Sequence, residues 1–270
     1  MRMKPDKRPD CPYPASSILN QITLLLETPM GLESRDYMRA DVRPAREATG
    51  RMDAARVAFL RRTYLHLAGA IVAFVVVESL LLRLPFISSV VETMAGSGMT
   101  WLLVLGLFMG VAYGADRLAR STAGAGVQYL GLGLYVVAEA LIFAPLLYIA
   151  TRHGGDGILS TAAIVTFGVC GALTAYVLIS GVNFSWLRGV VAVGGIAAML
   201  TIVGAIIFGF SLGVFFAGLM IMLAASMLLY QTSAAMHKWR TDQHVAAALG
   251  LFASVMLMFY YVVVFLMGRD

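Results

Sequence analysis

Charged residues are scarce in this chain of 270 residues. Asp, Glu, Lys and Arg together make up 13% of it, whereas hydrophobic residues make up 60% and the mean hydropathy is +0.82. Water-soluble globular domains carry about 25% charged residues. The composition therefore excludes a water-soluble domain of this length and predicts an all-α membrane protein that crosses the bilayer several times.

Cysteine and histidine are also rare, which excludes several kinds of site. The two cysteines, Cys11 and Cys170, fall in a polar tail and in an apolar segment, so they offer no disulfide framework. His237, Asp242 and His244 lie close together in the sequence, but they lack the i, i+4 histidine pair of helical zinc sites. Since the chain has no recognisable set of nucleophile, base and metal ligands, we expect neither an enzyme nor a cofactor.

The positive charge is concentrated near the amino terminus. Residues 1–62 hold 12 of the 20 Lys and Arg residues and 8 of the 15 Asp and Glu residues, and the whole chain has a net charge of +5. This excess is small, is interspersed with acids and is followed directly by an apolar segment. It therefore indicates a membrane-topology signal and not a nucleic-acid-binding surface.

Residues 1–58 are predicted to form a cytoplasmic, largely disordered basic tail. Its one apolar stretch, Ile18 to Leu26, is too short to cross a bilayer and too polar for a good signal-peptide core. Residues 52–62 are expected to be helical and to lead directly into the first span. Arg56, Arg61 and Arg62 would then lie at the lipid headgroups.

Residues 59–270 are predicted to form a domain of seven transmembrane helices. Each apolar segment is close to the roughly 20 residues that a spanning helix needs, and the segments are 64–84, 99–115, 127–150, 158–180, 187–209, 212–235 and 244–267. The stretch 85–98 is apolar but contains Glu92, and we expect an amphipathic segment on the outer surface. No internal repeat is visible, so an inverted-repeat transporter is not supported.

Basic residues in the connections predict the orientation. One set of connections is rich in them, with Arg117, Arg120, Arg188, Lys238 and Arg240, whereas the other set has Arg83, Arg152 and Arg269. The positive-inside rule places the amino terminus in the cytoplasm and, with seven spans, the carboxyl terminus outside. A bacterial-type cytoplasmic (inner) membrane is the expected location.

Glycine recurs every four residues in the second span, at Gly106, Gly110 and Gly114. Such a stripe lets a neighbouring helix backbone approach closely. We expect it to be a site of helix packing.

Glu139 is the most informative ionisable residue, because it falls near the middle of the third span. About twelve residues, or roughly 18 Å of helix, separate it from either end, so it must be protonated, paired or hydrated. A protonated acid hydrogen-bonded to a neighbouring helix and a functional acid are both open interpretations. Glu78, near the end of the first span, is expected to reach the outer interface.

Polar residues and a proline accompany Glu139 in the membrane region. Pro145 has no N–H to donate to the carbonyl oxygen of Leu141, which weakens the helix there. Backbone that is exposed at this depth is tolerated where it lines a cavity or packs within protein. The last two spans carry polar side chains that either line a hydrated inner vestibule or satisfy one another: Ser226, Tyr230, Gln231, Thr232, Ser233, Ser254, Tyr260 and Tyr261.

Four segments, in this order and spacing, resemble the Bax inhibitor family of membrane proteins: Phe59 to Tyr64, Ala138 to Tyr148, Leu229 to Ser233, and Ala246 to Phe252. The resemblance extends from about residue 59 to residue 267. It implies seven helices, six of them around a central last helix, and a proton-sensitive calcium leak.

The resemblance also implies a pH-sensing latch, formed by two aspartates on the last two spans and an arginine near the inner end of the second span. In this sequence the arginine corresponds to Arg117, or alternatively to Arg120. The two acids are replaced, by Gln231 after Tyr230 and by Ser254 in the last span. Neither replacement changes charge or attracts a divalent cation as a carboxylate does.

Two hypotheses follow for the function. The first is a leak for calcium or another cation across the lipid bilayer, with Glu139 and Pro145 as gating or permeation candidates beside Arg117, Tyr230, Gln231 and Ser254. The second is a non-conducting regulator that binds a membrane protease or a stress-response protein, since the acids of the latch are absent and the tail is long enough to bind a partner.

Overall fold

The computed structural model describes residues 54–95, 98–153, 155 and 157–268, and within them every regular element is a helix. The predictions for residues 1–53 lie outside the described residues. Seven of the helices are long and apolar enough to cross a membrane, which confirms the predicted all-α membrane fold. They are α3 (Ala54–Leu81), α5 (Gly98–Ala119), α6 (Ala125–His153), α7 (Ile158–Ser180), α8 (Leu187–Phe208), α9 (Val214–His237) and α10 (His244–Met267).

The connection between the first two spans contains a short helix, α4 (Ile87–Ala95), where the sequence predicts an amphipathic segment. Ile87 and Val91 of α4 are buried against Ala144 of α6. At the other end of the first span, α3 is already helical at Ala54. The predicted boundary between residues 58 and 59 therefore falls inside a helix.

Large apolar side chains cover the outer surface of the helices. Leu103 of α5, Ile179 of α7 and Phe215 of α9 are 70%, 86% and 81% exposed. In water such a surface would be unfavourable, whereas hydrocarbon tails solvate it well. The outward-facing residues therefore support a lipid environment around the bundle.

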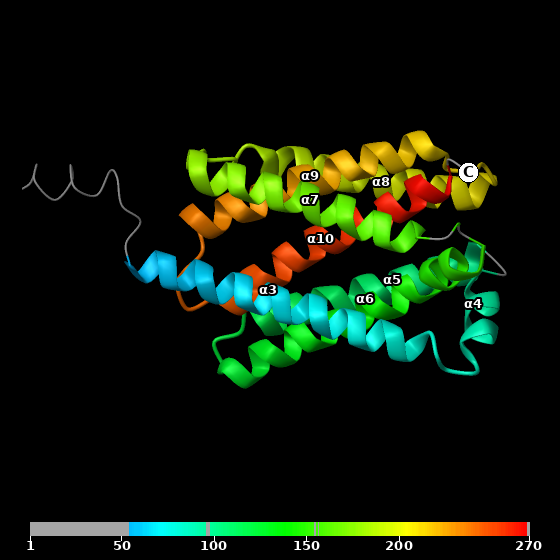
Figure 1. Cartoon of the computed structure of the whole chain (residues 1–270), viewed down its shortest axis with the longest axis horizontal. Helices are drawn as coiled ribbons and strands as arrows, with labels where there is room; N and C mark the ends of the chain where they lie inside the picture. Colours follow the sequence, from blue (N-terminus) through cyan, green and yellow to red (C-terminus); the bar gives the residue numbers. More distant parts are fainter. Residues whose placement is uncertain (1–53, 96–97, 154, 156, 269–270) are drawn as a thin grey trace, which may run out of the picture. The chain divides into compact units, whose positions relative to one another are not determined.

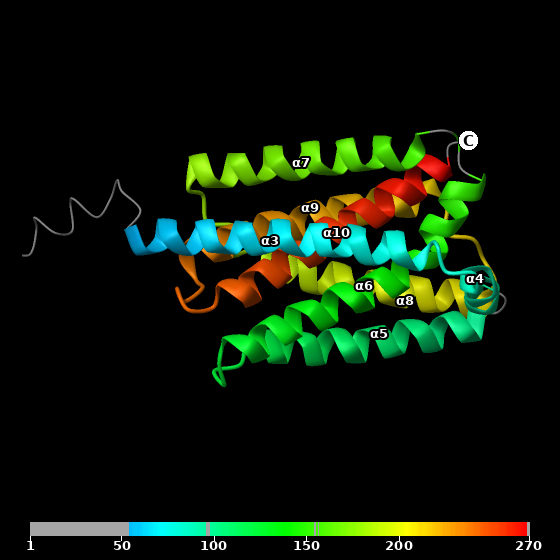
Figure 2. The ribbon, with the colours of Figure 1, turned by 60° about the horizontal axis from the view of Figure 1, so that its bottom comes forward.

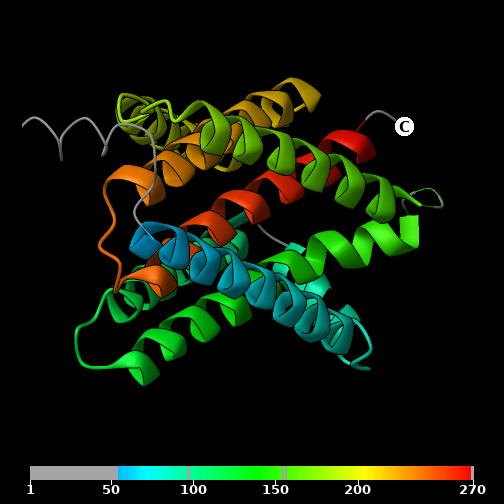
Figure 3. The ribbon, with the colours of Figure 1, turned by 60° about the vertical axis from the view of Figure 1, so that its left-hand side comes forward.

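The helices form two groups of three with α10 between them. Figure 1 shows α10 running between the group α3, α5 and α6 and the group α7, α8 and α9. Figure 3 shows α10 between α7 and α9 on one side and α3 and α6 on the other. In the view of Figure 2, α8 comes close to α6 and α5, and it also contacts α5. Helix α6 packs against α3 and α5, and α9 packs against α7 and α8. We call the end at which α3 and α10 begin the Ala54 end, and the end at which α10 finishes the Met267 end.

Helix α10 is the central helix. Its main neighbours are α3, α5, α6, α7 and α9, whereas α8 packs against α9 and α5. The resemblance implied six helices around the last one, and the central position of α10 agrees with it. Small residues near the start of α10 allow this close packing: Ala246, Ala247, Ala248 and Gly250 are all buried.

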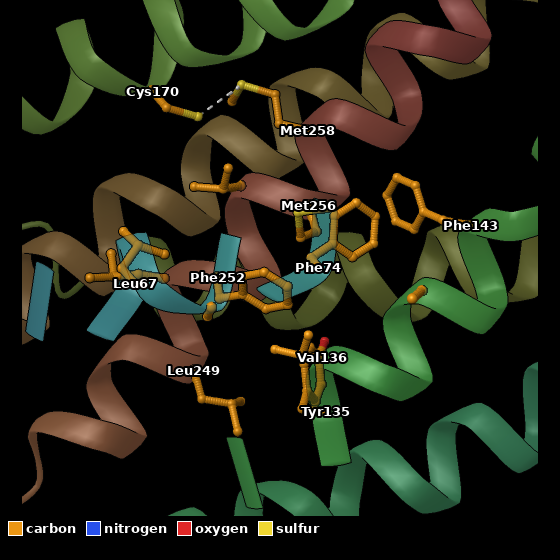
Figure 4. Packing of buried hydrophobic residues seen from close by; sticks show 14 of the residues in the cluster. Leu67, Phe74, Tyr135, Val136, Phe143, Cys170, Leu249, Phe252, Met256 and Met258 are labelled. Atoms are coloured by element: carbon orange, nitrogen blue, oxygen red, sulfur yellow. Dashed lines mark hydrogen bonds between the residues drawn. The ribbon is translucent and has the colours of Figure 1, made fainter. Parts of the chain in front are cut away.

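Aromatic rings pack against the middle of α10. The ring of Phe252 lies 6.3 Å from that of Phe74 on α3 and 6.0 Å from that of Tyr135 on α6, centroid to centroid. Figure 4 shows these residues around α10, together with the contact between Cys170 Sγ and Met258 Sδ at 3.6 Å. Side chains from both groups of helices thus meet on one helix.

A close crossing of α5 and α6 involves a glycine outside the predicted stripe. A Cβ atom on Gly131 of α6 would lie 2.6 Å from both the carbonyl oxygen of Ala115 and the amide nitrogen of Ala119 on α5. In contrast, a Cβ atom on Gly106, Gly110 or Gly114 would have no neighbouring atom within 4 Å in the described part of the chain. The prediction that this stripe packs against a helix is therefore wrong for the described chain, because those glycines face away from the other helices.

Replacing Gly131 by Val should destabilise the protein, because the new side chain would push α5 away from α6. We expect a loss of about 2 kcal/mol or more, seen as a lower midpoint of thermal unfolding in detergent. Gly110→Val adds the same side chain to the open face of α5 and is the matched control. Equal losses in both variants would contradict the assigned crossing.

Candidate functional site

A cavity of about 280 Å³ opens between the two groups of helices near the Met267 end. Residues of α5, α6, α8, α9 and α10 line it, among them Trp101, Phe108, Glu139, Phe216, Leu257, Tyr260 and Tyr261. Among the described residues, Glu139 is the one acidic residue in this lining. We call this cavity the Glu139 cavity.

Glu139 is 6% exposed in the helix bundle. Tyr135, one helical turn earlier on α6, interacts with its carboxyl group. The second carboxyl oxygen, Oε2, is buried and has no hydrogen-bond partner among the described residues. Glu139 lines the cavity, but Oε2 itself is covered by neighbouring atoms. A water or ligand could become its remaining partner only if neighbouring side chains moved.

Pro145 lies six residues after Glu139 within α6, and the helix continues through it to His153. It is buried, in the stretch of α6 that α4 covers at Ala144. Proline removes the N–H that would bond to the carbonyl of Leu141. This weakened turn of α6 thus lies just beyond the Glu139 cavity, where movement of the helix would alter the cavity wall.

A second cavity, of about 290 Å³, lies at the Ala54 end, and we call it the Gln231 cavity. Its lining comes from the end of α5, the last turns of α9 and the α9–α10 connection: Arg120, Tyr230, Gln231, Ala234, Lys238, Trp239 and Gln243. The candidate residues Tyr230 and Gln231 therefore belong to this cavity and not to the one that holds Glu139.

The candidate residues Gln231 on α9 and Ser254 on α10 lie near one another. The side-chain amide of Gln231 packs over Gly250, where an added Cβ would be 2.9 Å from its Nε2. One turn later, the hydroxyl of Ser254 donates to the carbonyl of Gly250 at 2.9 Å. Ser254 is fully buried, so its hydroxyl group is occupied by this bond to the backbone of its own helix.

The structure places Arg120, and not Arg117, beside Gln231. Arg117 is exposed and donates from Nε and Nη2 to the hydroxyl of Tyr113, at 3.1 and 2.5 Å. Arg120 lines the Gln231 cavity and pairs through Nε with Asp116 at 2.7 Å. Arg120, the alternative candidate for the arginine, is therefore the one that shares a cavity with Tyr230 and Gln231.

Glu78 is a second buried carboxylate that sequence reasoning missed. It is 4% exposed, and neither of its carboxyl oxygens has a hydrogen-bond partner among the described residues. The expectation that it reaches the outer interface is wrong, because its side chain is buried within the bundle. Glu139 is therefore not the only carboxylate deep in the bundle.

Arg56 makes a long-range contact that the sequence did not predict. Its Nη1 donates to the carbonyl oxygens of Trp239 at 2.6 Å and Ala235 at 3.3 Å. It thereby joins the start of α3 to the end of α9. The acceptors are about 180 positions further along the chain, so no local signal in the sequence could reveal this contact.

The serine hydroxyls of α9 bond to backbone groups. Ser226 donates to the carbonyl of Met222 at 2.9 Å. Ser233 accepts from the amide of Phe184 at 2.9 Å and so holds the α7–α8 connection against α9. These two hydroxyl groups are therefore satisfied by the backbone and not by one another, and Ser226 also lines a cavity between α8 and α9.

Replacing Glu78 by Met should leave the protein as stable as before or stabilise it by about 1 kcal/mol, because a buried polar group without a partner is removed at similar volume. The midpoint of thermal unfolding in detergent measures this change. Glu92→Gln on the exposed face of α4 is the control. A large loss of stability in Glu78→Met alone would show that the carboxyl group has a stabilising partner.

Comparison with known families agrees with the resemblance in the sequence. The family model described as "Inhibitor of apoptosis-promoting Bax1" matches residues 56–270, which include all seven long helices except the first two residues of α3. A comparison with curated proteins found no match. On the extent of the family match, the chain belongs to the Bax inhibitor family.

Proposed function

We propose that the protein is a cation leak of a bacterial-type cytoplasmic membrane, with calcium as the first ion to test. In this proposal the amino terminus is cytoplasmic and the carboxyl terminus is outside. The Gln231 cavity then faces the cytoplasm and the Glu139 cavity faces outward. The distribution of basic residues supports this orientation, because Arg120 and Lys238 lie in connections at the Ala54 end and Arg188 lies in the first turn of α8 at the same end.

The observation that carries the proposal is that Glu139, a buried acid, lines a cavity of the membrane domain. A carboxylate attracts a cation, and oxygen ligands are those that calcium prefers. An ionisable group at this depth is costly unless it has a function or a partner. The neighbouring hydroxyl groups of Tyr260 and Tyr261 add further oxygen atoms to the residues that line the cavity.

A closed stretch of α10 separates the two cavities. Gln231 contacts α10 at Gly250, and the Glu139 cavity reaches it at Leu257. Between these positions Leu251, Phe252, Ser254, Val255 and Met256 are buried. Permeation would require this stretch to move relative to one of the two groups of helices.

Protons should affect such a leak through Glu139. Gln231 and Ser254 do not ionise in the physiological range, so the two-acid switch of the family cannot operate at their positions. Only the ionised form of Glu139 attracts a cation. Flux should therefore decrease when the pH is lowered from 8 to 5.

Replacing Glu139 by Gln should lower calcium flux at pH 8 by about tenfold, as expected for the loss of one attractive charge at low dielectric, and should flatten the pH dependence. Flux is measured in liposomes that contain a calcium-reporting dye, with folding confirmed for each variant. Glu92→Gln removes an exposed acid of α4 and should leave the flux unchanged. Wild-type flux no greater than that of empty vesicles between pH 5 and 8 would reject the leak.

A non-conducting regulator is the second candidate. It is favoured by the bonding of Ser254 to the backbone of Gly250 and by the neutral Gln231, because neither position holds the acid on which the family's latch depends. In this case the domain would act by binding a membrane protease or a stress-response protein. Folded protein without flux would favour this function over the leak.

A further inference from the structure

The Gln231 cavity has the chemistry of an anion site. Its lining contains two cationic side chains, Arg120 and Lys238, and two amides, Gln231 and Gln243, but no carboxylate. An amide at position 231 offers N–H donors, which a carboxylate would not. With Gln231 in place of the aspartate that the family resemblance implies, the described lining of the cavity lacks a negative charge that would repel an anion.

Arg120 is held in place with part of its guanidinium group free. Its Nε donates to Asp116, and its Cζ lies 4.7 Å above the ring centre of Trp239. These contacts orient the guanidinium group, whose side chain is 45% exposed, and leave its terminal nitrogens for another acceptor. A fixed guanidinium fork is well suited to the oxygen atoms of a phosphate group.

Lys238 provides the second positive charge. Its Nζ lies 5.6 Å from the ring centre of Tyr230, which also lines the cavity. Asp116 partly offsets the charge of Arg120, whereas no described acid is paired with Lys238. The cavity therefore keeps a positive charge.

The start of α10 adds a third favourable contribution. Gln243 lines the cavity and is the N-cap residue of this 24-residue helix, and its side chain makes no capping hydrogen bond. The first turn of a helix carries unpaired N–H groups and a partial positive charge, which favour anions. Two side-chain cations and a long helix terminus thus meet at one cavity.

We propose that the Gln231 cavity binds a phosphate-type anion, supplied either by the headgroup of an anionic phospholipid or by free phosphate. A volume of about 290 Å³ is at the lower end of the roughly 300–1,000 Å³ of small-molecule sites, which suits a single headgroup. Under the proposed orientation the site lies at the inner leaflet, where anionic lipids attract basic residues. Binding itself requires no ion conduction.

A bound anion would bridge the two groups of helices. Arg120 follows α5, in one group, whereas Tyr230 and Gln231 belong to α9, in the other. The same anion would contact the start of α10 between them. Its occupancy would therefore stabilise the closed arrangement of α10.

Calorimetric titration of the full chain in neutral detergent tests the site with two probes, inorganic phosphate and dioctanoyl phosphatidic acid. Dioctanoylglycerol, which lacks the phosphate, is the control ligand. We expect saturable binding of at least one probe, and a loss of affinity of about tenfold or more in Arg120→Gln and in Lys238→Gln. Binding of the lipid alone would identify the headgroup as the ligand, whereas binding of both would identify the phosphate group itself.

Two further variants make the test specific. Gln231→Glu places a negative charge in the cavity without removing a cation and should also weaken binding, even if Arg120→Gln fails to fold. Arg240→Gln removes an exposed cation next to Trp239, which pairs with Asp242 and does not line the cavity, so its affinity should stay within about twofold of the wild type. The proposal is overturned if neither probe binds the wild type, or if the lining variants bind as well as Arg240→Gln.

Discussion

The burial of α10 between two groups of three helices is the constraint on which the rest of the structure depends. Direct contacts between the groups are few beside those that each makes with α10. In a membrane the helices do not associate through a hydrophobic driving force, so close packing must hold them together. The alanines and Gly250 near the start of α10 permit this packing, and the ring of Phe252 fills the space further along.

Both cavities lie where this packing between the groups is incomplete. One contains an acid and tyrosine hydroxyl groups, and the other contains two cations and two amides. A cation and an anion would thus be attracted to opposite ends of the same helix. Movement of α10 would change both cavities together, which offers a physical route from an anion at the Ala54 end to the environment of Glu139.

The sequence predicted the spans closely, because hydropathy and helix length decide what can cross a bilayer. The burial of Glu139 followed from its distance to either end of its span, and its place in the Bax inhibitor family followed from the order of four motifs. Contacts between distant segments could not be predicted in this way. Gly131 and not Gly106 makes the close crossing, Arg56 bonds to the end of α9, and Glu78 is buried, and each depends on which helices become neighbours.

In the orientation that we propose, the Glu139 cavity faces the outside and α10 closes it toward the cytoplasm. Cysteine labelling in a chain without Cys11 and Cys170 tests this arrangement most directly. Leu257 lines the cavity, whereas the adjacent Met256 is buried among other helices. A membrane-impermeant thiol reagent applied from outside should label Leu257→Cys and leave Met256→Cys unlabelled. Equal labelling of the two variants, or labelling of Leu257→Cys from the cytoplasmic side alone, would contradict the account.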